Sequence, residues 1–147
     1  MAMLQLNKKI EYALIAILHL DSLRRGDLAS AKDVAETYHI PAELLGKVLQ
    51  ALAKASIVES VQGAHGGYRL ASPMDDLTLG DVMDVIEGPL HFARCVDAPA
   101  ACEQYVHCTI REPVNRIQEE LKQFIHGIRL SSFRRKAPVE GMSIGAV

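Results

Sequence analysis

The chain has 147 residues, 49% of them hydrophobic and 23% charged, with a formal net charge of -2 at pH 7. This length corresponds to about one average domain and argues against a multidomain enzyme, while the composition argues against a disordered or fibrous chain. The charge excludes a polycationic nucleic-acid coat but not a local basic face. No run approaches about eighteen apolar residues, and the polar N-terminus does not resemble a secretory signal. We therefore expect a cytoplasmic protein with no membrane partner.

Three helices are predicted in the first part of the chain. Apolar residues recur at three- and four-residue steps over Lys8–Arg24, which indicates the first helix. Ser30 and Asp33 resemble a capping box that opens a second, short helix ending at Tyr38. A third helix is predicted over Pro41–Ala55, because proline suits the first helical position. Two short helices joined by a tight turn are a helix-turn-helix candidate.

A β-hairpin is predicted next. Residues 57–62 are rich in strand formers, residues 63–67 contain three glycines and must turn, and residues 68–70 can return as a second strand. The order of three helices and a hairpin is that of a winged helix, in which the third helix reads the major groove and the wing approaches the backbone or minor groove. Thr78 and Asp81 indicate a capping box for a short fourth helix that ends at Gly88.

A long amphipathic helix is predicted near the C-terminus, from about Thr109 to Ser131. A small domain cannot bury its whole apolar stripe, so we expect a second copy to cover it in a two-fold dimer that matches a palindromic operator. Packing back onto its own domain is the alternative. The expected fold is mainly α with a small β-hairpin wing. It comprises a winged helix-turn-helix domain (1–88), a cysteine-rich loop (89–108), a dimerisation helix (109–133) and a flexible tail (134–147).

Three cysteines lie in the loop, spaced C-x6-C-x5-C at Cys95, Cys102 and Cys108. This spacing is wider than the C-x2-C pairs of zinc ribbons and differs from the ferredoxin run. Thiolates are soft ligands that suit iron–sulfur clusters, but three are one short of four, so a further ligand must come from elsewhere. Zinc is less favoured but not excluded. Two further alternatives remain: the cysteines are small buried hydrophobes, or the protein is a cluster-free winged-helix regulator that senses oxidants through its thiols or binds a small ligand.

The exposed face of the third predicted helix carries residues that can meet base edges. Lys47 can donate to guanine or phosphate, and Glu43 can accept from cytosine, although a solvated helix charge is the alternative for each. The N-terminal lysines and the wing can reach phosphates or the minor groove. The residues expected to contact DNA are Lys8, Lys9, Glu43, Gly46, Lys47, Gln50, Lys54, Gln62, His65, Gly66 and Arg69.

Three features together resemble the bacterial IscR/NsrR family (Rrf-two superfamily) of winged-helix transcription regulators. They are the opening segment Leu6–Leu14, the wing Val61–Leu70, and the three cysteines before a long helix. The resemblance covers residues 3–133. It implies a homodimer that binds a double-stranded DNA operator, as a repressor rather than an enzyme. It also implies a cluster in the cysteine loop, with [4Fe-4S] preferred over [2Fe-2S], that senses iron–sulfur, redox or nitric oxide status.

The same resemblance suggests the fourth cluster ligand. Some family members use a histidine three residues after the last cysteine, but Arg111 stands there and a guanidinium cannot ligate while charged. Other members use a carboxylate on the first helix of the opposite subunit, and Glu11 is the matching residue. His107, beside Cys108, is the rival ligand. A carboxylate is harder and more labile than a thiolate, so it would leave one iron open to attack, as a sensor requires.

Overall fold

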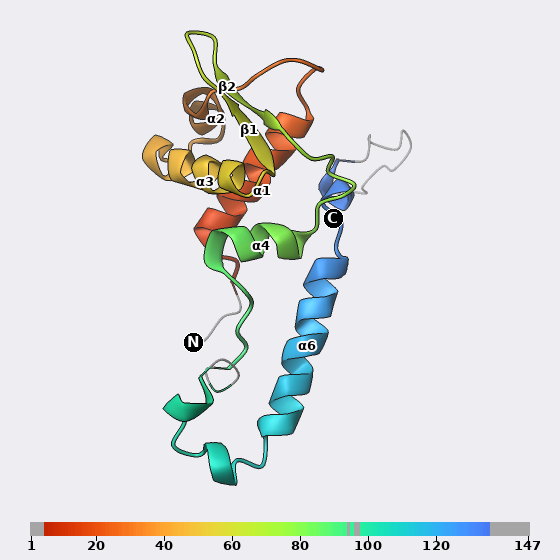
Figure 1. Cartoon of the computed structure of the whole chain (residues 1–147). Helices are drawn as coiled ribbons and strands as arrows, with labels where there is room; N and C mark the ends of the chain where they lie inside the picture. Colours follow the sequence, from red (N-terminus) through yellow and green to blue (C-terminus); the bar gives the residue numbers. More distant parts are fainter. Residues whose placement is uncertain (1–4, 94, 96–97, 136–147) are drawn as a thin grey trace, which may run out of the picture.

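The structure is a computed structural model of the chain and describes residues 5–93, 95 and 98–135. Three helices precede a β-hairpin, and a fourth helix follows it, in the order of a winged helix (Figure 1). The cysteine loop contains two short 3-10 helices and leads into a long helix. The elements are α1 (Lys8–Asp21), α2 (Ala31–Tyr38), α3 (Ala42–Lys54), β1 (Val58–Val61), β2 (Gly67–Leu70), α4 (Leu79–Glu87), η1 (Pro99–Ala101), η2 (Tyr105–His107), α6 (Arg111–Gly127) and η3 (Leu130–Phe133).

Side-chain caps fix where the helices begin. Asn7 accepts a hydrogen bond from the backbone N–H of Lys9 at 2.9 Å, at the start of α1. The Ser30 hydroxyl does the same for Asp33 at the start of α2, at 3.1 Å. Each cap satisfies a backbone donor that the first turn of a helix leaves unpaired. The capping box predicted for α4 is confirmed, with both reciprocal bonds between Thr78 and Asp81 present.

The hydrophobic core is built around α1, which contacts α3, α4 and β2. Its largest fully buried side chains come from α1, α3, β1, α4 and the segments around them. On α3 the row Leu45, Val48, Leu49 and Leu52 is buried, as the three- and four-residue spacing predicts. This packing holds α3 with its opposite face in solvent.

The wing is a two-stranded antiparallel hairpin with Val58 opposite Leu70 and Val61 opposite Gly67. A bridge between Ala29 and Tyr68 ties it to the chain before α2. A side chain at Gly66 would lie 2.2 Å from the Val61 carbonyl oxygen, which explains why the tip needs glycine there. The wing is thus positioned beside the N-terminal end of α2.

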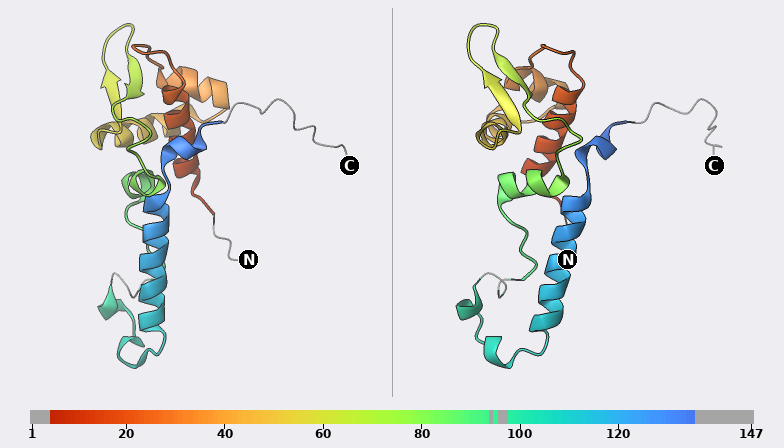
Figure 2. Two further views of the ribbon diagram at one scale, coloured as in Figure 1. Left: turned by 90° about the vertical axis from the view of Figure 1, so that its right-hand side faces the viewer. Right: turned by 45° about the vertical axis from the view of Figure 1, so that its right-hand side comes forward.

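The molecule is elongated. Figures 1 and 2 show α6 extending away from the winged-helix half, with the cysteine loop at its far end and the chain from α4 running back beside it. In the described ranges 5–93, 95 and 98–135, no helix is both long enough and apolar enough to cross a membrane. Along the long axis of the molecule, the cysteine loop and the hairpin lie at opposite ends.

Two predicted helix ends are wrong. The first helix ends at Asp21 rather than Arg24, and α6 ends at Gly127 instead of continuing to 131 or 133. After Gly127 the chain pairs with the segment before α4, because Leu79 donates to the Ile128 carbonyl and Leu130 to that of Leu77, both at 2.9 Å. Leu130 is 1% exposed and joins the core cluster. The C-terminal end of α6 is therefore anchored in the winged-helix half.

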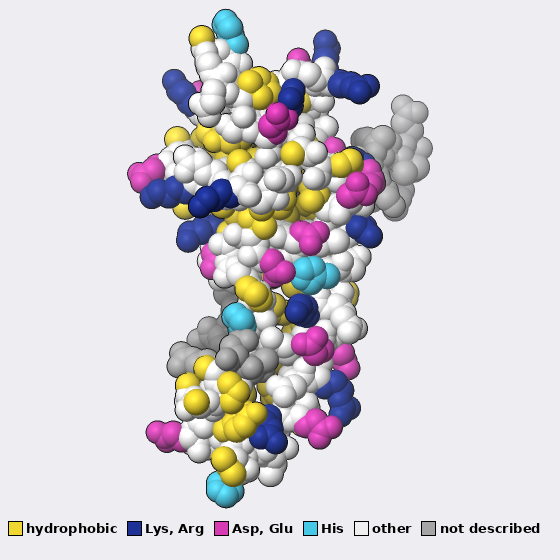
Figure 3. All heavy atoms as spheres, in the orientation of Figure 1, with side chains coloured by type: hydrophobic (Ala, Val, Ile, Leu, Met, Phe, Trp, Pro, Cys, Tyr) yellow, Lys and Arg dark blue, Asp and Glu magenta, His cyan; other side chains and the backbone are white. Residues whose placement is uncertain are grey.

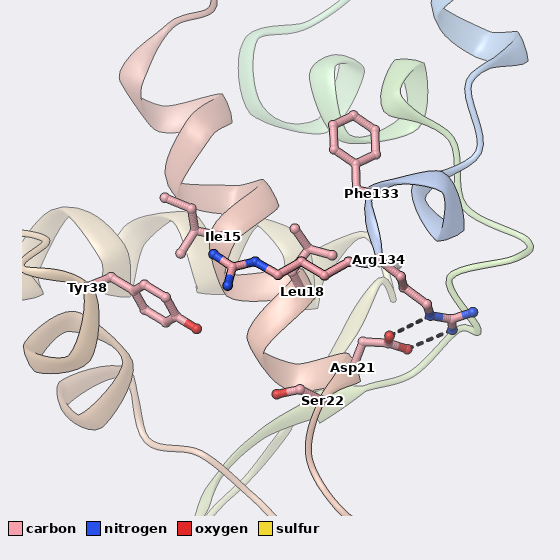
Figure 4. A pocket seen from close by; sticks show the side chains of 8 residues that line it. Ile15, Leu18, Asp21, Ser22, Tyr38, Phe133 and Arg134 are labelled. Atoms are coloured by element: carbon pink, nitrogen blue, oxygen red, sulfur yellow. Dashed lines mark hydrogen bonds and ion pairs between the residues drawn. The ribbon is translucent and has the colours of Figure 1, made fainter. Parts of the chain in front are cut away.

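The flexible tail predicted from residue 134 is also wrong at its start. Arg134 donates to both carboxylate oxygens of Asp21 at 2.7 and 2.9 Å, at the end of α1 (Figure 4). This pair holds the pKa of Asp21 below its ordinary value, chiefly through the hydrogen bonds from the guanidinium. The pair borders a hollow of about 620 Å³ between α1, the end of α2 and η3. Residues 136–147 of the predicted tail lie outside the described residues.

Candidate DNA-binding surface and cysteine loop

The outer face of α3 carries four of the residues predicted to contact DNA. Glu43, Lys47 and Gln50 are exposed, and Gly46 is half-buried. A side chain added at Gly46 would meet nothing within 4 Å. The packing of this chain therefore does not require a glycine there, and its absent side chain leaves the helix backbone open to close approach. We call Glu43, Gly46, Lys47 and Gln50 the reading face.

Within the reading face, Lys47 donates to Glu43 at 2.9 Å, one helical turn away. This hydrogen bond and the lysine charge lower the pKa of Glu43. Both side chains are largely exposed, so the pair can exchange its internal bond for contacts with a base or phosphate at small cost. Lys54 is exposed in the last turn of the same helix, where a cation suits the helix dipole.

A second group of cations lies beside α3. Lys9 of α1 and Lys47 of α3 line one shallow hollow, together with apolar side chains of α3 and α4. Figure 3 shows Lys and Arg side chains gathered around α3 and the start of α1. Lys8 is engaged differently, because it donates to Glu11 at 2.7 Å, which raises the Lys8 pKa. The chain therefore brings together cations from two helices as phosphate contacts require, despite its net negative charge.

The wing residues that were predicted to contact DNA differ in their exposure and in their partners. His65 is exposed at the tip, and Gln62 is exposed beside it and donates to Ser60 at 3.3 Å. Arg69 pairs across the hairpin with Glu59 at 2.7 Å, which raises the pKa of the guanidinium and lowers that of the carboxyl. Gly66 closes the turn. Gln62 and His65 are therefore better placed than Arg69 to contact a second molecule.

The three cysteines are free and half-buried at the far end of the molecule. Cys102 follows η1 and Cys108 follows η2, while Cys95 lies where the chain enters the loop. Among the residues the structure describes, no three His, Cys, Asp or Glu side chains are close enough to hold a metal ion. Glu11 lies on α1 and faces Lys8. A single copy of the chain therefore does not assemble the four predicted ligands.

Arg111, which was excluded as a ligand, and His107, the rival ligand, lie at the end of the loop. Arg111 stacks over the ring of Tyr105, with its central carbon 4.6 Å from the ring centroid, and it donates to the Tyr105 carbonyl. His107 ends η2 and is exposed. The Arg111 guanidinium is therefore occupied in closing the loop, in keeping with its exclusion as a ligand, while His107 is accessible beside Cys108.

Helix α6 has two different apolar rows. Val114, Leu121 and Ile125 are half-buried against their own chain. Ile110, Ile117 and Phe124, spaced seven residues apart, are 63%, 41% and 67% exposed. A seven-residue apolar repeat on a helix is the pattern that packs against another helix. The second row is therefore available to a partner.

The sequence interpretation missed two residues that position the site. Gln118 is the only buried residue of α6, and its amide bonds to the chain entering the cysteine loop. Its signal is present in the sequence, since it is a polar residue within the row that Val114, Leu121 and Ile125 continue. Arg134 has no such signal, because its partner Asp21 is 113 positions away.

The fold and the reading face define a winged helix-turn-helix protein of the DNA-binding class. Comparison with known proteins is more specific: the chain belongs to the Rrf2 family, described as iron-dependent transcriptional regulators, whose sequence profile matches residues 6–136. A relative from Aquifex aeolicus that carries the name HTH-type transcriptional regulator is 28% identical over 120 residues, which are 80% of this chain and 83% of that protein.

Solved structures show the same fold. CymR, the global cysteine regulator of B. subtilis, is 28% identical with a TM-score of 0.64, covering 89% of this chain and 96% of that one. IscR of T. potens is 26% identical with a TM-score of 0.63, covering 88% and 85%. The predicted winged-helix fold and the family resemblance are confirmed. The chain is about equally similar to CymR and to IscR.

Proposed function

We propose that the chain is a homodimeric, operator-binding repressor whose cysteine loop holds an iron–sulfur cluster and reports its state to the DNA-binding half. The observation that carries this proposal is the placement of three free thiols on one loop, at the end of a helix whose other end is anchored beside α4. In this proposal residues 1–88 bind DNA and residues 89–108 hold the cluster and sense its state. The helix that follows residue 108 forms the dimer.

DNA binding rests on the reading face and the cations around it. Lys47 and Gln50 can donate to base edges in the major groove, and Glu43 can accept from cytosine once Lys47 moves to a phosphate or base. Lys8, Lys9 and Lys54 supply the charge that holds the phosphate backbone. Gln62, His65 and Gly66 approach the neighbouring groove from the wing, and Arg69 does so if its pair with Glu59 opens.

Dimerisation rests on the exposed row of α6. Ile117 and Phe124 of α6 and its N-cap residue Ile110 are exposed, and a second copy related by a two-fold axis would present the same row. Complete burial of an exposed side chain of this size is worth about 1.5–3 kcal/mol, and these side chains, 41–67% exposed, would each gain a part of that before the cost of association. Two copies would also present two reading faces to the two halves of a palindromic site.

The cysteine loop fits an iron–sulfur cluster by the chemistry of its donors. Cys95, Cys102 and Cys108 supply three soft thiolates, and Glu11 of the partner subunit would supply the fourth ligand, with His107 as its rival. When bound, the cluster supplies iron that gains or loses electrons and reacts with oxidants or nitric oxide. The chain's own residues hold it: the loop provides three ligands, and α1 would release Glu11 from Lys8 to provide the fourth.

The direct test is purification without air, followed by measurement of iron, sulfide and visible absorption. Wild type should bind iron and sulfide, Cys102→Ala should lose them, and Glu11→Ala should lose most of them. Glu43→Gln, which changes a carboxylate far from the loop, is the matched control and should bind like wild type. A colourless wild type that also resists reconstitution with iron and sulfide would overturn the cluster proposal.

A cluster-free thiol regulator is the second candidate. It is favoured by the likeness to CymR, the global cysteine regulator, and by the placement of the three cysteines, which among the described residues do not lie close enough together to hold a metal ion. In that case the half-buried thiols react directly, and operator binding changes with peroxide treatment of iron-free protein but not with iron. Mass spectrometry of the treated protein would then find a disulfide or an oxidised cysteine.

A further inference from the structure

The side chain of Gln118 lies buried at the middle of α6. It is 5% exposed, and no other described residue between Met83 and Arg129 is buried. Its Oε1 atom accepts from the backbone N–H of Phe92 at 2.6 Å, and its Nε2 atom donates to the carbonyl of Leu90 at 2.9 Å. A buried carboxamide is costly unless both of its ends are paired, and here both are.

The geometry is that of strand pairing made by a side chain. The carbonyl of one residue and the N–H of the residue two further on point to the same side of an extended chain, and an amide between them satisfies both. Gln118 therefore fixes the segment from Leu90 to Phe92 on α6 as a neighbouring strand would. The side chain of Leu90 is half-buried and that of Phe92 is 49% exposed.

The position of this amide connects two ends of the molecule. Cys95 lies three residues after Phe92, so the pinned segment is the entrance of the cysteine loop. The other end of α6 is bound to the winged-helix half through Ile128 and Leu130, and His126 lies 3.3 Å from the Asp84 carboxylate of α4. These contacts form a continuous connection from the loop entrance to α6 and from α6 to α4.

We propose that Gln118 is a positioning residue that holds the entrance of the cysteine loop on α6 and thereby couples the chemical state of the loop to the DNA-binding half. This inference rests on the proposed function for the signal it transmits. The clamp itself is a property of the described chain and can be tested without iron or DNA.

The first experiment measures the clamp alone. In Gln118→Met a side chain of similar size loses both hydrogen bonds, whereas Gln123→Met makes the same change at an exposed position of the same helix. Hydrogen exchange of the Phe92 amide, corrected for intrinsic rates, should accelerate about tenfold in Gln118→Met, the size expected for one lost hydrogen bond. Gln123→Met should leave it unchanged. Equal exchange in both variants would overturn the clamp.

A second variant separates the hydrogen bonds from general packing. In Gln118→Glu the ionised carboxylate can accept from Phe92 but cannot donate to Leu90, while the protonated acid can do both. Protection of Phe92 in this variant should therefore rise on acidification, whereas Gln118→Met should show no such rise. Protection of Phe92 that does not rise on acidification in Gln118→Glu would contradict the proposal.

The third experiment measures the coupling. Operator affinity is compared between iron-loaded and iron-free protein or, if wild type binds no iron, between reduced and peroxide-oxidised protein. Gln118→Met should bring this ratio of affinities towards one, and Gln123→Met should keep the wild-type ratio. Lost Phe92 protection with an unchanged ratio would refute the coupling. If wild type binds no iron, the cluster proposal fails and the exchange experiments still decide on the clamp.

Discussion

The two ends of the chain are stabilised in opposite ways. In the winged-helix half, α1 alone buries six residues, and α3 adds a complete apolar row. From Met83 to Ile117, no described residue is buried, although this stretch contains all three cysteines. The half that recognises DNA is therefore held by its core, whereas the half with reactive side chains is held by a few hydrogen bonds.

This difference shows in which part of the molecule a conformational change costs little free energy. Regions with few buried contacts open and rearrange at low free energy, and ligand-binding segments are drawn from them. A loop whose thiols change state can then move without unfolding the reading face. The connection between the halves is narrow: α6, the Gln118 amide, and the segment from Ile128 to Arg134.

The largest difference between the two ends should appear in a pair of matched truncations. Leu45→Ala removes a fully buried side chain from α3 and should lower the free energy of unfolding by about 3–5 kcal/mol. Val106→Ala removes methyl groups from a side chain that is 82% exposed and should change it by less than about 0.5 kcal/mol. Urea denaturation measures both. Similar losses would mean that the loop end contributes a core of its own.

The C-terminal anchor is the next test. Leu130→Ala removes a buried side chain from the segment that follows α6 and should cost about 2–3 kcal/mol, because that segment packs into the winged-helix core. Lys122→Ala, at an exposed position of α6, is the control and should be close to neutral. If Leu130→Ala were also neutral in urea denaturation, the segment would not be part of the core.

Gly46 separates folding from DNA recognition. A side chain there meets nothing in this chain, and replacing a helical glycine raises helix propensity, so Gly46→Gln should stabilise the fold by about 0.5–1 kcal/mol. The same side chain would stand between α3 and the groove and should weaken operator binding by about tenfold or more. Asn115→Gln on α6 is the control for binding. Unchanged operator affinity in Gly46→Gln would exclude close approach at this position.

The smallest expected effect concerns the Arg134 pair. Arg134→Met should lower the free energy of unfolding only slightly at pH 7, because the pair is partly exposed. The arginine holds the folded-state pKa of Asp21 below its unfolded value. The contribution of the pair is therefore complete above about pH 4, the ordinary aspartate pKa, and is lost as the pH falls through the lowered value.

Urea denaturation of wild type and Arg134→Met between pH 7 and pH 3 should accordingly show two curves that converge towards acid. Arg135→Met makes the same change one residue further on and should leave stability within about 0.5 kcal/mol of wild type. Curves that stay parallel down to pH 3 would show that the loss comes from packing of the arginine stem instead.

Local signals account for what the sequence predicted. The caps at Ser30 and Thr78 act within one helical turn, and the glycines of the wing act within the hairpin, so the starts of α2 and α4 and the position of the turn are confirmed. Pro41 stands one position outside α3 as its N-cap, a difference of one residue from the prediction. The buried row of α3 follows directly from its spacing.

Non-local partners account for what the sequence missed. Ile128 continues the apolar spacing of α6, but backbone bonds to Leu77 and Leu79, about fifty residues earlier in the chain, draw the segment out of the helix. The cysteine loop has no periodicity. Its residue types therefore predicted thiolate ligands, but its sequence could not predict where the three sulfur atoms lie in space. Gln118 was missed because its partners are backbone atoms 26 and 28 positions earlier in the chain, and only its place in the apolar row of α6 marks it in the sequence.

The most direct test of the proposed cluster site asks whether the partner subunit supplies the fourth ligand. Two differently tagged chains, Cys102→Ala and Glu11→Ala, are mixed, and the heterodimer is purified without air for iron and sulfide analysis. A ligand from the partner subunit predicts one intact site per heterodimer, although the Cys102→Ala homodimer has none and the Glu11→Ala homodimer has lost most of its iron. The doubly substituted chain paired with wild type should then bind no iron. Iron in that second heterodimer and none in the first would contradict the account, because Glu11 would then serve its own chain.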